Sequence, residues 1–395
     1  MSAAAFHGLV AAKRRILFYV QDSWGLGHIQ RVSKLARALQ DSAECLILCG
    51  HREAGRIVPE GCEYIRIPSL DVPLSHGSGG VFWGRPSPWR WDCEEALALR
   101  RRLIESAVTA FRPHIIVVEN RPLGMMNELR PILHGTSATK IFLSRGIMTH
   151  PSRVRQHFLD PDQEEALRSS FDRIIVAADR RVWDLAAEYE LDAEIARKID
   201  YVGYMSEAVG EPEIATTRAE RGVHQNRRWI VCSAGGGALG EPLIEAFSDV
   251  AALLRGLAVD IVHGPHSQVA WPEGVNVSTA GADIRLHKEC ARLALLHASA
   301  DVIVCPGGYN SIVECMEGGG RIIAMPVQPD QDGEQHLFCS RLAKFYPITT
   351  VCAAAKLRQT LLETVASSHE RRSVRAYGQL DFDGLRRARD LLLSI

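Results

Sequence analysis

The residue in this chain best suited to acid–base chemistry is a histidine in a glycine-rich segment near the amino terminus. His28 follows Gly25 and Gly27, and the segment comes directly after residues 16–20, an apolar run typical of a strand. Glycines let the backbone approach a ligand closely, and the free N–H groups at a helix start can bind an anion. Because an imidazole changes charge near neutral pH, we expect His28 to act as a general base at the mouth of a cleft. The alternative is a polar residue that only begins a helix.

The same glycine spacing also occurs in the dinucleotide-binding fingerprint of dehydrogenases. Here Gln30 stands where the third glycine of that fingerprint belongs, and residues 49–52, where an acid would bind the ribose, read Cys-Gly-His-Arg. A Rossmann dehydrogenase is therefore a weaker alternative.

A second glycine-rich loop follows the apolar run of residues 229–233. It contains Gly235, Gly236, Gly237 and Ala238, and its backbone N–H groups are free to meet a diphosphate without hindrance from side chains. No Gly-Lys-Ser/Thr sequence follows, which excludes the P-loop of nucleotide hydrolases. A flexible turn is the alternative interpretation of such a glycine run.

The third loop is the most specific of the three and follows the strand-like residues 301–305. A helix is expected to begin near Asn310, so that Asn310 or Ser311 caps it and binds phosphate together with the free N–H groups. Glu314 lies one turn further along, where a carboxylate can accept hydrogen bonds from two hydroxyls of a ribose. The next apolar run leads into a polar loop, residues 326–335, suited to the hydroxyls of a sugar. The candidate ligand-binding residues of these two loops are Gly307, Gly308, Tyr309, Asn310, Ser311, Glu314, Asp332 and Gln335.

Strand-like runs alternate with helical patterns along both halves of the chain, and most runs are apolar on both faces, as in buried parallel sheets. This alternation predicts an α/β protein with two doubly wound, Rossmann-like domains that face each other across a cleft. We expect a flexible N-terminus (1–13), a first domain (14–204), a polar linker (205–221), a second domain (222–380) and a C-terminal helix (381–395).

Composition narrows the class of protein. The 395 residues carry a net charge of −1, so the chain lacks an overall positive field for nucleic acid or an anionic membrane. No apolar run approaches the ~20 residues of a membrane-spanning helix, and the N-terminus lacks the pattern of a secretory signal. The ten cysteines include no C-x-x-C pair, and the histidines show no metal-ligand spacing. We expect a cytoplasmic protein with reduced thiols and neither metal nor cofactor; peripheral membrane contact stays open.

Together these motifs resemble the MurG-like glycosyltransferases (family 28), most closely a subgroup of predicted bacterial glycosyltransferases. The resemblance rests on three segments and spans about residues 14–345. They are residues 16–31, with Gly25-Leu26-Gly27-His28 and Arg31; residues 121–131, with Arg121-Pro122-Leu123-Gly124-Met125; and residues 308–314, with Gly308-Tyr309-Asn310-Ser311 and Glu314.

The resemblance implies a GT-B fold with the acceptor bound mainly by the first domain and the donor by the second. It places His28 as the base and Glu314 on the ribose, and it makes Gln335 a contact of the donor sugar. Gly27 and the loops 235–238 and 307–311 would hold the donor diphosphate, and Leu286 and His287 would meet the nucleobase through their backbone. One departure concerns the donor sugar, because Phe338 or Cys339 stands near a position where the peptidoglycan enzyme has asparagine.

The expected activity is an inverting, metal-independent transfer of a sugar from a UDP-type donor to an acceptor hydroxyl. Glu119, at the end of residues 114–119, is expected to orient His28. Candidate acceptor contacts are Asn120 and Arg121, together with Trp83, Arg85 and Trp89 in the long Gly- and Pro-rich segment 68–91. The tryptophans could instead pin that segment to its own domain. The main alternative activity is a nucleotide-sugar hydrolase, whose opening motif is similar.

Overall fold

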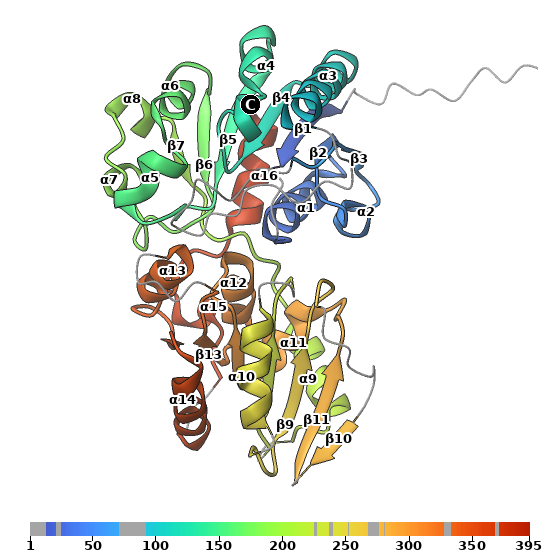
Figure 1. The fold of residues 1–395 in the computed structure, drawn as a ribbon, viewed down its shortest axis with the longest axis vertical. Helices are drawn as coiled ribbons and strands as arrows, with labels where there is room; N and C mark the ends of the chain where they lie inside the picture. Colours follow the sequence, from blue (N-terminus) through green and yellow to red (C-terminus); the bar gives the residue numbers. More distant parts are fainter. Residues whose placement is uncertain are drawn as a thin grey trace, which may run out of the picture.

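The computed structural model describes residues 13–20, 25–70, 92–224, 227–236, 240–251, 253–267, 276–279, 281–327, 333–367 and 371–395. The two halves of the chain each form a sheet, and the sheets lie one above the other in Figure 1.

The first sheet has seven parallel strands among the described residues, in the order β3-β2-β1-β4-β5-β6-β7. This order reverses between β1 and β4, so the loops after these two strands flank the crevice where such sheets bind ligands. The strands are β1 (Arg14–Val20), β2 (Ala43–Cys49), β3 (Glu63–Arg66), β4 (Ile115–Glu119), β5 (Thr139–Ser144), β6 (Arg173–Val176) and β7 (Ile199–Tyr201).

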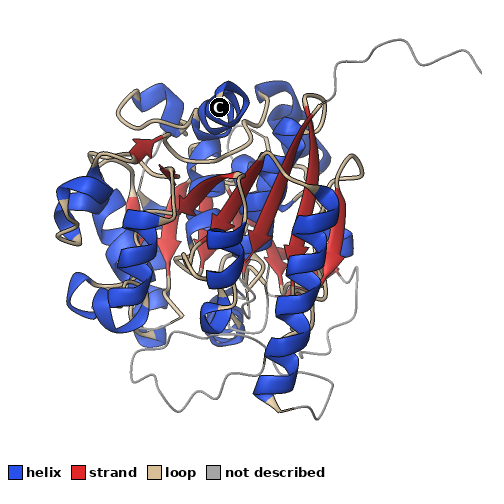
Figure 2. Ribbon diagram, turned by 90° about the horizontal axis from the view of Figure 1, so that it is seen from above, coloured by secondary structure: helices blue, strands red, loops and turns tan. Residues whose placement is uncertain are grey.

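Helices lie on both sides of the strands in the view of Figure 2. The helix that matters most for the site is α1, whose apolar stripe of Val32, Leu35, Ala36 and Leu39 is fully buried. The helices of this half are α1 (Gly27–Leu39), α2 (Ala54–Ile57), α3 (Cys93–Phe111), the 3-10 helix η2 (Met125–Asn127), α4 (Arg130–Gly135), α5 (Pro151–His157), α6 (Pro161–Ser169), α7 (Leu185–Glu188) and α8 (Ala193–Ala196).

The second sheet repeats this plan in the order β10-β11-β9-β8-β12-β13-β14, and its order reverses between β8 and β12. β10 runs antiparallel to β11, and the other neighbouring strands are parallel. The strands are β8 (Trp229–Ser233), β9 (Ala258–Val262), β10 (Asn276–Thr279), β11 (Ala282–His287), β12 (Val302–Cys305), β13 (Arg321–Ala324) and β14 (Ile348–Thr350). The helices are α10 (Glu241–Ala251), α11 (Leu293–Ser299), α12 (Tyr309–Gly318), α13 (Glu334–Leu342), α14 (Ala354–Ala366), α15 (Val374–Tyr377) and α16 (Gly384–Ser394).

Two strands, β3 and β11, were not predicted from the sequence pattern, because the prediction relied on runs that are apolar on both faces. β3 lies at the edge of its sheet and is largely exposed, whereas β11 alternates buried and half-buried residues. Both strands therefore lack the apolar signature of a central parallel strand.

The connection between the halves contains a helix that the sequence pattern did not predict. Within the expected linker 205–221, α9 (Glu211–Glu220) packs on α11 through one buried apolar residue, Ile214. Because a single apolar side chain produces no period, this helix looks like a polar linker in the sequence.

At its end the chain returns to the first half, where α16, red in Figure 1, packs on α1. Two backbone hydrogen bonds join the segment before α16 and the start of α16 to Tyr204, which follows β7. Tyr204 N donates to Asp381 O at 2.8 Å, and Gly384 N donates to Tyr204 O at 3.1 Å.

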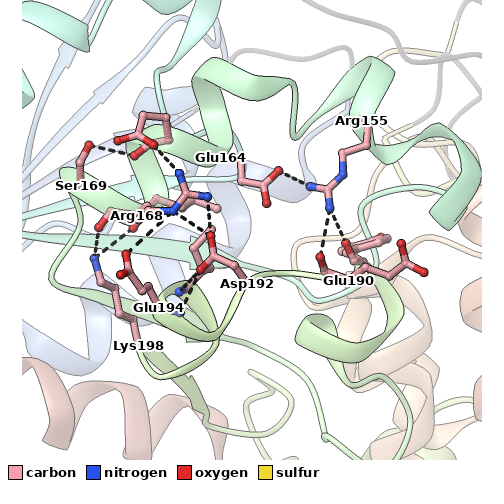
Figure 3. Close-up of polar contacts among 12 residues, drawn as sticks. Arg155, Glu164, Arg168, Ser169, Glu190, Asp192, Glu194 and Lys198 are labelled. Carbon is pink, nitrogen blue, oxygen red and sulfur yellow. Dashed lines mark hydrogen bonds and ion pairs between the residues drawn. The ribbon is translucent and has the colours of Figure 1, made fainter.

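A polar network ties α5, α6 and α8 together on the first half (Figure 3). Arg155 pairs with Glu164 and donates to the backbone at the end of α7, while Arg168 Nε donates to Asp192 at 2.7 Å. Lys198 Nζ caps the end of α6 and its following turn, with 2.7 Å to Phe171 O. The network fixes α5, whose flanking residues line the cavity described next.

Candidate active site

A cavity of about 710 Å³ lies between the carboxyl ends of the two sheets. Its lining includes the loops and helix starts that follow β1, β2, β4 and β5 on one side and β8, β9, β11, β12 and β13 on the other. The predicted residues among its lining are Gly27, His28, Asn120, Gly235, Gly236, Gly308, Tyr309, Asn310, Ser311, Glu314 and Gln335.

The centre of the first-sheet wall is a pair formed by His28 and Glu119. His28 stands in the first turn of α1 and Glu119 ends β4, so the two strands at the reversal of the sheet order bring them together. Nδ1 of His28 lies 2.8 Å from both carboxylate oxygens of Glu119. With Nδ1–H donating to the carboxylate, the lone pair of the neutral ring is on Nε2, where it can accept a proton.

The electrostatics of this pair favour a neutral imidazole beside an ionised carboxylate. Burial is the main influence on the pKa of His28 and lowers it; Glu119 opposes this effect, while Arg145 and Arg31 add to it. Burial by itself would raise the pKa of Glu119, but the interactions of its carboxylate with His28 and Arg31, including their hydrogen bonds, outweigh burial and hold that pKa well below its usual range. His28 therefore has the protonation state that a general base needs at neutral pH.

The opposite wall is built around the start of α12. Gly308 precedes this helix, Ser311 lies in its first turn, and both residues line the cavity. The first N–H groups of a helix have no partner within the helix and can bind an anion. Asn310 Nδ2 donates to Gly27 O at 2.8 Å, which joins the glycine loops of the two halves. Gly235 adopts φ 64°, a left-handed conformation that favours glycine.

Gly307 does not line the cavity but is needed behind it. A Cβ at this position would lie 2.7 Å from Cys339 Sγ and 3.3 Å from Gln335 Cβ. The glycine thus allows α13 to pack closely against the loop after β12, and α13 carries Gln335 into the cavity.

Two ion pairs cross the cavity from one half of the chain to the other. Lys34 Nζ lies 2.6 Å from Oε1 of Glu314, and Arg145 Nη2 lies 2.5 Å from Oε2 of Glu334. Burial raises the pKa of Glu334. Gln335 Oε1 accepts from Val327 N at 2.9 Å, so its amide group keeps its two N–H donors for other partners.

The expected nucleobase contacts at the end of β11, Leu286 and His287, are absent from the described lining of the cavity. Leu286 is buried opposite Ile261 in the ladder, and the carbonyl of His287 accepts from His263 N at 3.0 Å. The imidazole of His287 bonds to the buried Asp260 at 2.6 Å. Residues further along the chain, Glu289, Cys290 and Ala291, line the cavity.

The expected acceptor contact Arg121 also points elsewhere. Asn120 lines the cavity in a left-handed conformation, φ 69°, and the chain turns there. Arg121 is absent from the described lining of the cavity, and its Nη2 lies 3.5 Å from Asp160 Oδ2. The remaining predicted site residues lie outside the described residues: Trp83, Arg85, Trp89, Gly237, Ala238 and Asp332.

Several lining residues were not predicted from the sequence. Arg31 and Lys34 follow His28 at intervals of three along α1, a polar row that could have been recognised beside the apolar stripe. Arg145 directly follows β5, the position that identified the other loops. Met148, Thr149 and Phe158 also line this wall.

Among the residues that the structure describes, no group of three or more His, Cys, Asp or Glu side chains is placed to hold a metal ion. Within the same residues, no helix has the length and apolar character needed to cross a membrane. All ten cysteines are free thiols.

Solved structures similar to this chain include glycosyltransferases with the GT-B fold. The glycotransferase of kitacinnamycin aligns over 96% of this chain and 98% of its own, with a TM-score of 0.61 and 15% identity. MurG from Acinetobacter baumannii aligns over 97% and 100%, with a TM-score of 0.58 and 12% identity. Arabidopsis thaliana UGT89C1 in complex with UDP aligns over 97% and 99%, with a TM-score of 0.60 and 15% identity. The same Arabidopsis protein has been solved with quercetin and with UDP-L-rhamnose.

In sequence, the chain matches no protein-family model and no curated protein. The structural similarity confirms the predicted GT-B fold, with two Rossmann-like sheets. MurG is among the structures similar to this chain, but so are other GT-B enzymes at comparable identity, so the likeness does not single out the MurG-like subgroup.

Proposed function

We propose that this protein is a glycosyltransferase that moves a sugar from a nucleotide diphosphate donor to a hydroxyl of an acceptor. The observation that carries the proposal is that His28, held from behind by the buried Glu119, lines a cavity whose opposite wall is a glycine loop and helix start. GT-B neighbours, one of them solved with UDP and with a UDP-sugar, support a nucleotide sugar as the donor.

In this proposal the donor binds to the second half of the chain. Its diphosphate accepts hydrogen bonds from the backbone after Gly308 and from Ser311, at the positive end of α12. Glu314, one turn further, holds the ribose, and the amide of Gln335 meets the sugar. Lys34 occupies one oxygen of Glu314, so a ribose would share this carboxylate with the ammonium group or displace it.

The reaction we propose is a single displacement. His28 Nε2 removes the proton of the acceptor hydroxyl as its oxygen attacks the anomeric carbon and the bond to the diphosphate breaks. The backbone donors at the two glycine loops stabilise the negative charge of the departing diphosphate, which makes a metal ion unnecessary. One displacement inverts the anomeric centre.

The first test is turnover of a panel of nucleotide sugars, followed by mass spectrometry with and without candidate acceptors. His28→Ala should lower turnover by roughly 10²–10⁴-fold, the range for loss of a general base, with little change in donor affinity. His134→Ala serves as the matched control, because His134 is exposed on α4 in the same half and does not line the cavity.

Near-wild-type turnover by folded His28→Ala protein would remove His28 from the mechanism. Donor consumption that no acceptor accelerates would point to a nucleotide-sugar hydrolase, in which water takes the place of the acceptor.

A further inference from the structure

Arg31 is a buried charged residue beside the site, and the reaction proposed above does not use it. It lies one helical turn after His28 on α1, and only 2% of its side chain is exposed. Its Nη2 donates to Oε1 of Glu119, the carboxylate that also accepts from His28, and lies 3.4 Å from His28 Nδ1. A buried guanidinium is costly unless it is paired, so the geometry of this contact is tightly constrained.

The need for this guanidinium follows from the charges around Glu119. Glu119 is fully buried, and a neutral imidazole as its only partner would leave one uncompensated negative charge in the interior. Such a charge would draw a proton to itself or onto His28. Arg31 balances the carboxylate, so that an ionised Glu119 can orient a ring that stays neutral.

Arg31 also contacts the second half of the chain, through the ring of Tyr309. Its guanidinium carbon lies 5.3 Å from the centroid of the Tyr309 ring, a cation–π distance. Tyr309 is itself fixed, because its hydroxyl donates to Ala177 O at 2.6 Å and accepts from Met205 N at 3.2 Å. The residue that begins the donor-side helix therefore also limits the positions open to Arg31.

We propose that Arg31 is a positioning residue that holds Glu119 in place and keeps His28 in the neutral form with its lone pair on Nε2. This inference rests on the proposed role of His28 as the base. Arg31 itself touches neither donor nor acceptor in this scheme; it acts through Glu119.

The expected effect on protonation depends on all the charges around His28. Those close to it are Glu119 from β4, Arg31 from α1 and Arg145 after β5, and Arg145 is paired with Glu334 of α13. Lys34, further along α1, is paired with Glu314 of α12. Of these, Glu119 favours the imidazolium, while Arg31 and Arg145 oppose it. Removing Arg31 should therefore raise the pH at which the His28–Glu119 pair takes up its proton.

The experiment is a pH titration of the full chain by NMR with ¹⁵N-labelled histidine, which requires no acceptor. The signals of His28 are assigned by their absence from the His28→Ala spectrum. In the wild type we expect the Nδ1–H tautomer and a pKa below the usual value of histidine. In Arg31→Met the apparent pKa of His28 should rise by about 1 unit or more, the common effect of one neighbouring charge. Arg31→Lys, which keeps the charge, should shift it by less than half as much.

Arg180→Met is the matched control. Arg180 pairs with Asp184 and its guanidinium lies 5.6 Å from the Tyr201 ring, so it makes the same two kinds of contact in the same half, away from the cavity. It should leave His28 unchanged. An unchanged His28 titration in folded Arg31→Met, or an equal shift in Arg180→Met, would overturn the inference. If Arg31→Met does not fold, an Nε2–H tautomer of His28 in the wild type would overturn it as well.

The two proposals can fail separately. Active His28→Ala protein would refute the proposed base, whatever the titration shows. Inactive His28→Ala protein with an unchanged titration in Arg31→Met would refute the role of Arg31 alone.

Discussion

Replacing Glu119 by glutamine changes one buried carboxylate into an amide of nearly the same shape. Two partners are affected, since His28 Nδ1 and Arg31 Nη2 both donate to this carboxylate. The amide group of glutamine can donate to Nδ1, and the proton of the neutral ring would then sit on Nε2. A ring in that tautomer presents an N–H group to the cavity and cannot accept the proton of an acceptor hydroxyl.

The size of the effect follows from burial. Glu119 is fully buried and Arg31 is 2% exposed, so the substitution leaves an arginine without its counter-charge in the interior. Breaking a buried ion pair in this way costs about 3–5 kcal/mol of stability. The loss of turnover should match that of a lost base, roughly 10²–10⁴-fold. This corresponds to an increase of about 2.7–5.4 kcal/mol in the barrier.

The assay is release of the nucleoside diphosphate from the donor, measured from pH 5.5 to 9.5 alongside thermal unfolding. Because Glu119 raises the pKa of His28, its removal lowers that pKa further. The acid limb of the profile should move to lower pH, and raising the pH should not restore turnover. Arg31→Met should move this limb in the opposite direction.

Glu128→Gln is the matched control for the stability loss. Glu128 is fully buried in the same half, where it pairs with Arg100 and accepts from Tyr19, and neither of these partners lines the cavity. It should lose about 3–5 kcal/mol of stability as well, with turnover within a few-fold of the wild type. If folded Glu119→Gln protein keeps turnover within about threefold of the wild type, Glu119 does not orient the base and the reasoning is wrong.

Three further predictions concern the donor side of the cavity. Glu314→Ala should weaken UDP binding by about 1.5–3 kcal/mol, roughly 10–150-fold, as expected for a lost charged hydrogen bond. Calorimetry with UDP, and with TDP and GDP as controls, measures this, and unchanged UDP affinity would remove Glu314 from the site. Turnover should survive EDTA, because backbone donors face the expected diphosphate; complete loss that magnesium or manganese restores would contradict this. Gly307→Ala should lower the free energy of unfolding by about 1–3 kcal/mol, because the new Cβ would lie 2.7 Å from Cys339 Sγ. An unchanged melting temperature would contradict this and would show that the loop can shift to accept the methyl group.

The sequence by itself determined the elements around the site. Most strands are apolar on both faces, and that pattern depends on neighbouring residues alone, so the parallel sheets and the glycine loops after β1, β8 and β12 were predictable. The same logic placed His28 after one strand and Glu119 at the end of another, and the structure shows that these two strands meet at the reversal of the sheet order. The sequence pattern did not predict β3 and α9, because these elements bury too few residues to produce an apolar pattern.

The tertiary structure decided which polar groups are already paired and which still face the cavity. Lys34 meets Glu314 across 280 positions of the chain, and Arg145 meets Glu334 across 189, so no local pattern connects them. Leu286 and His287 end β11, where the carbonyl of His287 accepts from His263 N, and residues further along the chain, Glu289, Cys290 and Ala291, line the cavity. Position along the chain determines which element carries a residue. The direction of its side chain and the partner of its backbone depend on packing between elements distant in sequence, which is why they appeared only in the folded protein.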